Sequence, residues 1–486
     1  ARHHMLKNLI NRVQNVTETK PDQVPEQQSK PDPDIIKLIK NYPRESNPEK
    51  LFQTLFLRIK KIIDHNDYYE FKKRFSGTMR ELSRRHGLQS SLNLIKRIEV
   101  AMGLRKPCLA IYDHCLHFIG GGQKYGMTMA FALQHFFDVT IVADKPVTHE
   151  NIRDWYDLDL SHCSIRIIPI PFYEKLGTTH LDPVYVTKKI KNPFHLISLE
   201  SAKYDFFINN SMLEMVYPLA NVSVMMVHFP ERRPSYYFYS HAYTAIMYNS
   251  KYTASWIEKK WKFSPHKHIY PPVDMMVYDG SSSKKNIILS VARFEEGGTK
   301  KQLEMIKSFI RLTRTFPETA SQWKLILVGG SNPGNPYLSA VKDLIKQSAG
   351  DQIELKVNIS AEALKSLYRD AKIFWHLCGL GQNDPAKVEH FGMTICEAMQ
   401  NSIVPVVFDG GGQREIIEHR VNGFRVNSTF QLIQYTHELM EDPDKLNEMG
   451  KAAREKSKQY DKARFIIEVK EFFNELYRNH LGQTEA

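Results

Sequence analysis

The feature that most constrains the fold of this chain is an alternation of short apolar runs with amphipathic stretches, which begins after Lys106. Between several of the runs lie helical stretches, such as Gln123–Phe137 and Lys251–Lys262. This alternation is typical of repeated βαβ units, in which a parallel sheet is covered by helices on both faces. The predicted strands are Cys108–Tyr112, Val139–Ala143, Ser164–Ile170, Phe206–Asn209, Val222–His228 and Ala245–Tyr248.

Two adjacent prolines in the segment Tyr270–Asp274 interrupt this pattern and predict a stiff connector. A second series starts at Asn286, and helices at about 430–440, 444–458 and 461–479 close the chain. The predicted strands of this series are Ile287–Val291, Lys324–Val328, Ile353–Lys356, Ile373–His376 and Val404–Phe408. The expected fold class is therefore α/β, with two Rossmann-like domains that face each other across a cleft.

Three parts follow from these boundaries. Residues 1–106 form a basic helical N-terminal extension. Residues 107–274 form an N-terminal Rossmann-like acceptor domain, completed by a C-terminal helix at about 461–480. Residues 275–460 form a C-terminal Rossmann-like donor domain. A chain of 486 residues is long enough for two or three such units.

Positive charge is concentrated in the extension. Residues 1–106 contain 22 Lys and Arg against 12 Asp and Glu, a net +10 of the total +12. The pattern of residues 35–103 is helical, with one apolar face from Leu51 to Ile63 and a second amphipathic stretch at Leu88–Met102. One interpretation is docking on an anionic membrane surface or on a partner. The other is an appendage packed on the main body. Nucleic acid is an unlikely partner, because stacking aromatic residues are not interleaved with the charges.

Five scattered cysteines, odd in number, match neither a disulfide framework nor a zinc pattern. Reduced thiols and a cytoplasmic protein, peripherally associated with membrane at most, are the expectation. No apolar run approaches the roughly 18 residues that span a bilayer.

Two segments at predicted strand ends contain residues suited to phosphate binding. Gly120, Gly121 and Gly122 follow the first strand, where backbone without Cβ atoms can approach a ligand closely; the alternative is a flexible turn. Arg293 and one of Lys300 and Lys301 flank a glycine turn after strand Ile287–Val291. Two fixed cations there could neutralise a departing diphosphate.

The segment Glu389–Glu397 places a carboxylate on each side of a predicted helix start. Phe391 and Gly392 would form the turn, so the amides of Gly392, Met393 and Thr394 would face a phosphate. Glu397 could accept a hydrogen bond from a ribose hydroxyl, and Glu389 could reach a sugar ring. The alternative is that both glutamates only favour the positive helix N-terminus or form salt bridges.

In combination, these segments resemble the retaining, nucleotide-sugar-dependent glycosyltransferases of family four (group 1), which have the GT-B fold. The resemblance covers about 107–480 and depends on the order of the motifs. They are the Gly120–Gly122 loop, Val227–Pro230, the Tyr270–Asp274 linker, Arg293 with Lys300, the two glutamates with seven residues between them, Gly410–Gly412 with Glu415–Ile417 and Asn422–Phe424, and Tyr460–Asp461 before the final helix.

The resemblance implies a role for each matching residue. Arg293 and Lys300 would bind the donor diphosphate, with Lys300 favoured over Lys301 by the helical phase, and Glu397 would hold the ribose. The catalytic set would be Glu389, His228, Arg293 and Lys300, with His228 near the reacting centre. The donor-binding set would add Gly121, Gly122, Lys301, Phe391, Gly392, Met393, Thr394 and Glu397.

The implied reaction transfers a sugar from a nucleoside-diphosphate sugar to a hydroxyl of a glycan, glycolipid or lipid-linked saccharide, with retention at the anomeric carbon. We expect no cofactor and no metal, since no Asp-x-Asp triplet of the sequence makes a compelling metal site. Two alternatives stay open: a nucleotide-sugar epimerase or phosphorylase with the same fold, and a non-catalytic basic scaffold. The sugar, the base, the acceptor, and covalent or same-face attack are not distinguished by these residues.

Overall fold

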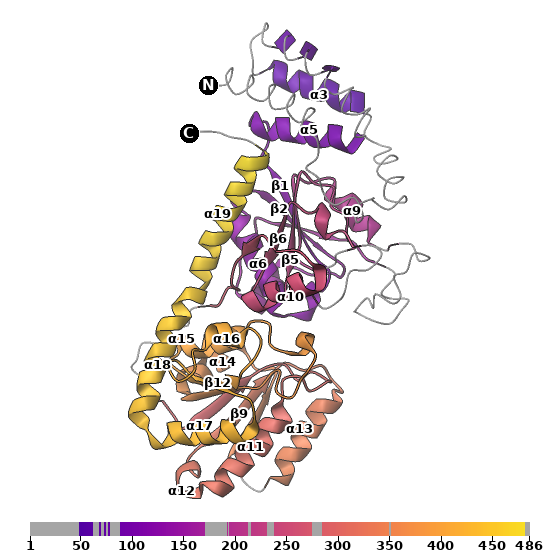
Figure 1. Cartoon of the computed structure of the whole chain (residues 1–486). Coiled ribbons are helices and arrows are strands. Elements are labelled where there is room, and N and C mark those ends of the chain that lie inside the picture. Colours follow the sequence, from indigo (N-terminus) through magenta and orange to yellow (C-terminus); the bar gives the residue numbers. More distant parts are fainter. Residues whose placement is uncertain are drawn as a thin grey trace.

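The computed structural model describes residues 48–61, 68–69, 72–73, 76–77, 88–170, 192, 194–211, 215–230, 238–274, 284–348 and 351–481. Two α/β domains and a helical extension lie in a row, with the N-terminal domain in the middle (Figure 1). Parts of the predicted N-terminal extension lie outside the described residues. They are residues 1–47, 62–67, 70–71, 74–75 and 78–87.

The N-terminal domain is built on a seven-stranded sheet in the order β3-β2-β1-β4-β5-β6-β7, and every pairing in it is parallel. The strands are β1 Cys108–Asp113, β2 Asp138–Ala143, β3 Ser164–Ile167, β4 Phe206–Asn209, β5 Val222–Val227, β6 Ala245–Tyr248 and β7 Lys267–His268. Because all strands run the same way, the residues that follow them gather at one edge of the sheet.

The C-terminal domain contains a six-stranded, all-parallel sheet in the order β10-β9-β8-β11-β12-β13. Its strands are β8 Ile287–Val291, β9 Lys324–Gly329, β10 Ile353–Val357, β11 Ile373–His376, β12 Val404–Phe408 and β13 Phe424–Val426. The chain thus has the two doubly wound sheets that the alternating pattern predicts.

Helices cover both faces of each sheet because successive strand residues point to opposite sides. In β1, Leu109 and Ile111 pack with helices α6, α7 and α19, whereas Ala110 and Tyr112 pack with α9 and α10. The second sheet is covered by α11, α13 and α17 on one face and by α14, α15 and α18 on the other. The helices are α6 Gly121–Leu133, α7 His149–Tyr156, α9 His195–Ser201, α10 Lys251–Trp261, α11 Gln302–Thr315, α12 Pro317–Ala320, α13 Pro336–Gln347, α14 Ala361–Asp370, α15 Met393–Gln400, α16 Gln413–Ile416, α17 Thr429–Glu441, α18 Pro443–Ser457 and α19 Lys462–His480.

The last helix, α19, returns from the C-terminal domain to the N-terminal one (Figure 1). Its apolar side chains Phe465, Val469 and Phe473 are buried in the core of the N-terminal domain, where Phe465 meets Tyr125 of α6 edge to face. Asp461 caps the helix by accepting from the amide of Arg464. The two domains are therefore connected twice, near Asp274 and through α19.

The strand predictions were inexact in three places. The strand expected at Ser164–Ile170 ends at Ile167, since Pro169 has no amide to donate to the ladder and the amide of Ile170 bonds to Asp144 instead. The two-residue strand β7 was not predicted. The short strand β13, only three residues long, was not predicted either. It pairs with β12 and brings the chain after Gly423 back to the sheet.

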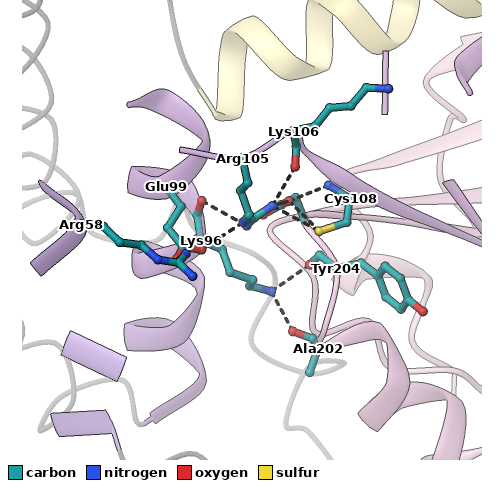
Figure 2. Close-up of polar contacts among 9 residues, drawn as sticks. Arg58, Lys96, Glu99, Arg105, Lys106, Cys108, Ala202 and Tyr204 are labelled. Carbon is teal, nitrogen blue, oxygen red and sulfur yellow. Dashed lines mark hydrogen bonds and ion pairs between the residues drawn. The ribbon is translucent and has the colours of Figure 1, made fainter. Parts of the chain in front are cut away.

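The extension docks on the amino ends of the strands, at the opposite edge from the carboxyl ends (Figures 1 and 2). Helix α5 (Leu88–Ala101) places Lys96 against the carbonyls of Ala202 and Tyr204, at 2.7 and 2.8 Å. Arg105 forms a bidentate ion pair with buried Asp205, and Arg105 also contacts Glu99 of α5 at 3.0 Å. These contacts support the interpretation of a packed appendage for residues 88–106.

Helix α3 (Pro48–Lys60) packs on α5, and its apolar residues Leu55, Phe56 and Ile59 are buried. Arg58 joins the two helices through an ion pair with Glu99 (Figure 2). The described part of the apolar face predicted from the sequence is thus buried within the protein. Among the described helices, none combines the length and apolarity that crossing a bilayer requires.

Candidate active site

The two domains meet through residues that follow the carboxyl ends of their strands. Phe229, just after β5, stacks on His390 of the C-terminal domain with 4.1 Å between ring centroids. Ser250 follows β6 and caps α10 by accepting from the amide of Thr253, and its hydroxyl donates to the carbonyl of His390 at 2.7 Å. The two carboxyl edges, where ligands bind in such sheets, therefore face each other.

A second link across this interface is made by Glu415 of α16. Its carboxylate accepts from the first amides of α10, those of Lys251 and Tyr252, at 3.0 and 2.8 Å, and from the hydroxyl of Tyr270. A carboxylate at a helix N-terminus satisfies amides that have no partner within the helix. Burial raises the pKa of Glu415 above its ordinary value, although these hydrogen bonds oppose that change.

The centre of the candidate site is Glu389, whose Oε2 atom has two partners at 2.9 Å, Lys300 Nζ and His376 Nε2. Lys300 precedes α11, and His376 ends β11. Burial alone would raise the pKa of Glu389, but the Lys300 charge and the hydrogen bond from His376 hold it well below its usual range. Burial alone would lower the pKa of Lys300, but the Glu389 carboxylate holds the pKa of this lysine above its ordinary value. The pair is therefore ionised at neutral pH.

His376 orients the Glu389 carboxylate. An ionised carboxylate can only accept, so Nε2 of His376 carries the proton in this hydrogen bond. Its other ring nitrogen, Nδ1, is buried and has no hydrogen-bond partner within the described structure. A proton on Nδ1 would be left buried without an acceptor.

His376, Cys378 and Glu389 are also a group that could hold a metal ion, with ligand atoms within 4.8 Å of one another. The ammonium of Lys300, however, lies 2.9 Å from Glu389 Oε2 and 3.7 Å from Cys378 Sγ. Burial is the main cause that raises the pKa of the Cys378 thiol, to about 12, so the sulfur is protonated and a poor ligand. Lys300 thus supplies the positive charge at this position.

Helix α15 begins next to this cluster. Its N-cap Gly392 has φ 114°, a conformation that residues with a side chain rarely adopt, and an added Cβ would lie 2.7 Å from Cδ1 of Ile395. Met393 opens the helix, and its sulfur faces Gly121 across the interface, where a Cβ would lie 3.0 Å away. The start of α15 therefore lies close to the start of α6 in the other domain, and a helix N-terminus of this kind is suited to an anion.

Glu397 lies just over one turn into α15. It accepts from the hydroxyl of Tyr368 at 2.9 Å, and Lys124 of α6 lies 3.9 Å from its other oxygen. Lys124 also pairs with Asp274 in the linker at 2.6 Å. Burial raises the pKa of Glu397 despite the Lys124 charge and the Tyr368 hydrogen bond. The interface therefore holds a second charged cluster, beside the helix rather than at its start.

On the opposite side, His228 lies against the first turn of α6. A Cβ on Gly122 would be 3.2 Å from the ring, so glycine is needed for this approach. The ring also meets Tyr125 edge to face and lies near Asn210, with Nε2 3.2 Å from Oδ1. Burial, and secondarily His390, lowers the pKa of His228 to about 4, so the ring is neutral at physiological pH. Gly121 and Gly122 belong to the helix itself, with Gly120 as N-cap.

Two predicted residues lie apart from the Glu389 cluster. Arg293 is more than half exposed and pairs with its neighbour Glu295 at 3.3 Å. Lys301 caps α11 in the left-handed conformation, with its ammonium 3.9 Å from Glu304. Sequence reasoning assigned no role to His376, His390, Asn210 or Lys124. For His390, the available signal was its position directly after Glu389.

Two doubly wound domains with facing carboxyl edges define the GT-B class. Residues 278–456 match the family model described as glycosyl transferases group 1, which agrees with the resemblance noted from the sequence. Anabaena HepE in complex with UDP and glucose has this fold too, with a TM-score of 0.56, 14% identity, and coverage of 76% of this chain and 99% of that one. Sucrose-phosphate synthase from Thermosynechococcus elongatus is similar at a TM-score of 0.56, 17% identity, and coverage of 77% and 100%.

Two curated relatives share part of the sequence. The Dictyostelium discoideum GDP-Man:Man(3)GlcNAc(2)-PP-Dol alpha-1,2-mannosyltransferase is 27% identical over 49% of this chain and 50% of its own length. The mouse alpha-1,3/1,6-mannosyltransferase ALG2 is 28% identical over 37% of this chain and 45% of its own length. The chain thus spans about half the length of the curated relatives it matches.

Proposed function

We propose that the protein is a retaining glycosyltransferase that moves a sugar from a nucleoside-diphosphate sugar to a hydroxyl acceptor. The observation that carries this proposal is the partly buried Lys300–Glu389 ion pair beside the N-terminus of α15, which lies close to the first turn of α6. This arrangement combines a fixed cation and free helix amides for a diphosphate with a carboxylate for sugar hydroxyls. The family match over the same domain supports it.

In the proposed reaction, the bond between the anomeric carbon and the phosphate oxygen breaks, and its electron pair leaves with the diphosphate. Lys300 and the amides at Met393 and Thr394 stabilise the new negative charge. Arg293, which is exposed and paired only loosely, would turn to the diphosphate when the donor binds. Glu397 would accept from the ribose in place of the contact with Tyr368.

The acceptor oxygen then bonds to the anomeric carbon, and its proton passes to the leaving phosphate oxygen. We favour this same-face course over covalent attack by Glu389. A carboxylate whose pKa lies well below its usual range, and which is held by both Lys300 and His376, is a weak base and a weak nucleophile. Glu389 would therefore orient the sugar and stabilise positive charge at the anomeric carbon.

GDP-mannose is the first donor to test, because both curated relatives are named as mannosyltransferases. A lipid-linked saccharide ending in mannose is the first acceptor class, after the name of the Dictyostelium protein. UDP-glucose is the matched comparison donor, since a structure of HepE contains it. The choices of GDP-mannose and of the lipid-linked acceptor come from relatives that share about half their length with this chain.

The test is transfer from GDP-mannose, UDP-glucose and ADP-glucose to such an acceptor, with the anomeric configuration of the product read by NMR. We expect one donor to be strongly preferred, retained configuration, and full activity in EDTA, since Lys300 occupies the cation position. An inverted product, or activity lost in EDTA and restored by Mn²⁺, would contradict the mechanism. Absence of hydrolysis or transfer from every donor would favour the scaffold alternative.

The alternatives of the same fold are less well supported. An epimerase or phosphorylase would need to explain the glycosyl transferase family match.

Contact of the extension with anionic membranes remains a proposal that rests on its charge of +10. Since the apolar side of α3 is buried, such contact would use exposed groups such as Leu57 and Lys60. Equal liposome binding by the whole chain and by a chain lacking residues 1–87 would exclude it.

A further inference from the structure

Three polar residues, two of them buried and one half-buried, form a chain across neighbouring strand ends of the N-terminal domain. Asp113 ends β1, Asn210 follows β4 and His228 follows β5. These three strands are adjacent in the sheet, in the order β1-β4-β5, so the residues lie side by side at the edge that faces the other domain. Asp113 and Asn210 are at most 2% exposed.

The hydrogen bonds of Asn210 fix the direction of its amide. Its Nδ2 atom lies 2.6 Å from Oδ2 of Asp113 and 3.0 Å from the carbonyl oxygen of Gly122. A backbone carbonyl can only accept, whatever the protonation of Asp113, so the NH₂ group must point to Gly122. The amide oxygen, Oδ1, is then the atom that meets His228.

This direction determines the tautomer of His228. An amide oxygen can only accept, so the Nε2 atom of His228, 3.2 Å away, must carry the proton. The Nδ1 atom of the neutral ring is then the nitrogen with a free electron pair, which can accept from a substrate hydroxyl. Such an assignment follows from the network of hydrogen bonds and not from an observed hydrogen atom.

Packing holds both side chains in place. A Cβ on Gly126 would lie 2.5 Å from Nδ2 of Asn210, so α6 approaches the amide as closely as a glycine allows. The ring of His228 is confined by Gly122 and by Tyr125, at 5.5 Å between centroids. Asp113 is anchored in turn by the amide of Cys115 at 3.0 Å.

We propose that Asn210 is a positioning residue for the transfer reaction. Asn210 holds His228 as the Nε2-protonated tautomer, so that Nδ1 of His228 can accept from a sugar or acceptor hydroxyl. The proposal rests on the proposed function for its catalytic consequence. The tautomer itself does not depend on any activity, and the two parts can therefore be tested separately.

The direct test is the ¹⁵N spectrum of histidine-labelled whole protein at neutral pH, with the His228 signals assigned by their loss in His228→Asn. We expect Nε2 to appear as the protonated nitrogen and Nδ1 as the unprotonated one. In Asn210→Leu, which keeps the size and removes the hydrogen bonds, a mixture of tautomers should appear. Asp113→Asn is the matched control and should keep the wild-type tautomer, because Gly122 still orients Asn210.

Since Asn210→Leu leaves the Asp113 carboxylate buried without its partner, the double variant Asp113→Asn/Asn210→Leu serves if the single variant does not fold. Turnover should fall about 10²-fold in Asn210→Leu and in the double variant, whereas donor affinity should change little. The reason is that both variants lose the Asn210 amide, which orients a reacting group. A protonated Nδ1 in the wild-type ring, or an unchanged tautomer in folded Asn210→Leu, would overturn the proposal. A mixed tautomer in Asn210→Leu with wild-type turnover would overturn its catalytic part.

Discussion

Two buried lysines at opposite edges of the sheets show how the partner determines what a buried cation does. Lys96, at the amino edge, donates to two neutral carbonyls, those of Ala202 and Tyr204. Burial, helped by Arg105, lowers the pKa of Lys96 to about 8. Lys300, at the carboxyl edge, faces the carboxylate of Glu389, which keeps it charged. Lys96 holds helix α5 against the N-terminal domain. Lys300 keeps a permanent charge at the edge where we propose that the donor binds.

The surroundings of the two lysines differ in the same way. Near Lys96, Arg105 forms an ion pair with Asp205, which also accepts from the backbone amide of Cys108. Glu99 contacts the same arginine (Figure 2). Around Lys300, the first helix amides of α15 leave capacity for a further anion. The comparison predicts that changes at the amino edge alter stability, whereas changes at the carboxyl edge alter transfer.

The largest expected effect is on stability at the amino edge. Arg105→Leu should lower the free energy of unfolding by about 3–5 kcal/mol, since the charge of Asp205 is left buried without its partner. Arg58→Ala is the matched control, because Arg58 also pairs with Glu99 but is half exposed; it should cost about 1 kcal/mol or less. Chemical denaturation measures both. Equal losses would refute a buried, structural role for Arg105.

Glu389→Gln is expected to reduce turnover by about 10²–10³-fold, roughly 3–4 kcal/mol of transition-state stabilisation. The amide keeps the size of the side chain and can still accept from His376, so the fold should remain. Transfer assays together with a circular dichroism spectrum measure the two properties. Activity within a few fold of wild type would remove Glu389 from the mechanism.

The smallest effect is the pH dependence at Lys96. Lys96→Met should destabilise the protein by roughly 1–3 kcal/mol, since two buried carbonyls lose their donor. The folded pKa of Lys96, about 8, lies below its ordinary value of 10.5. The contribution of Lys96 to the free energy of unfolding is therefore fully present above pH 10.5 and is lost as the pH falls through 8.

The stability difference between wild type and Lys96→Met should consequently widen as the pH rises from 8 towards 10.5. Denaturant titrations at several pH values measure it, and Lys106→Met, at a more exposed lysine, is the control. A difference that narrows over this range would mean that Lys96 stays charged when buried.

Much of the architecture could be predicted because the relevant signals are local. The apolar runs and the two prolines near Tyr270 predicted both sheets, and the glycine at Gly392 predicted the start of α15. The three-residue strand β13 was not predicted, because so short a run has no periodicity. The strand predicted through Ile170 ends early because one proline removes a ladder amide.

The contacts that complete the site could not be predicted, since they depend on the order of strands in the sheet. Asn210 lies 97 residues from Asp113 and meets it only because β4 pairs with β1. Arg105 and Asp205 are 100 residues apart. His376 was visible as the end of a strand, but its bond to Glu389 depends on the path of the loop between them.

The central claim is that the Lys300 position binds the diphosphate of a donor. Calorimetric titration of GDP and of UDP into wild type, Lys300→Ala and Lys301→Ala tests it most directly. We predict that wild type and Lys301→Ala bind one of the two nucleotides with similar affinity, and that Lys300→Ala, folded by circular dichroism, binds it at least about tenfold more weakly, since a charge-assisted contact contributes roughly 1.5–3 kcal/mol. Equal affinity in Lys300→Ala and wild type would contradict the account.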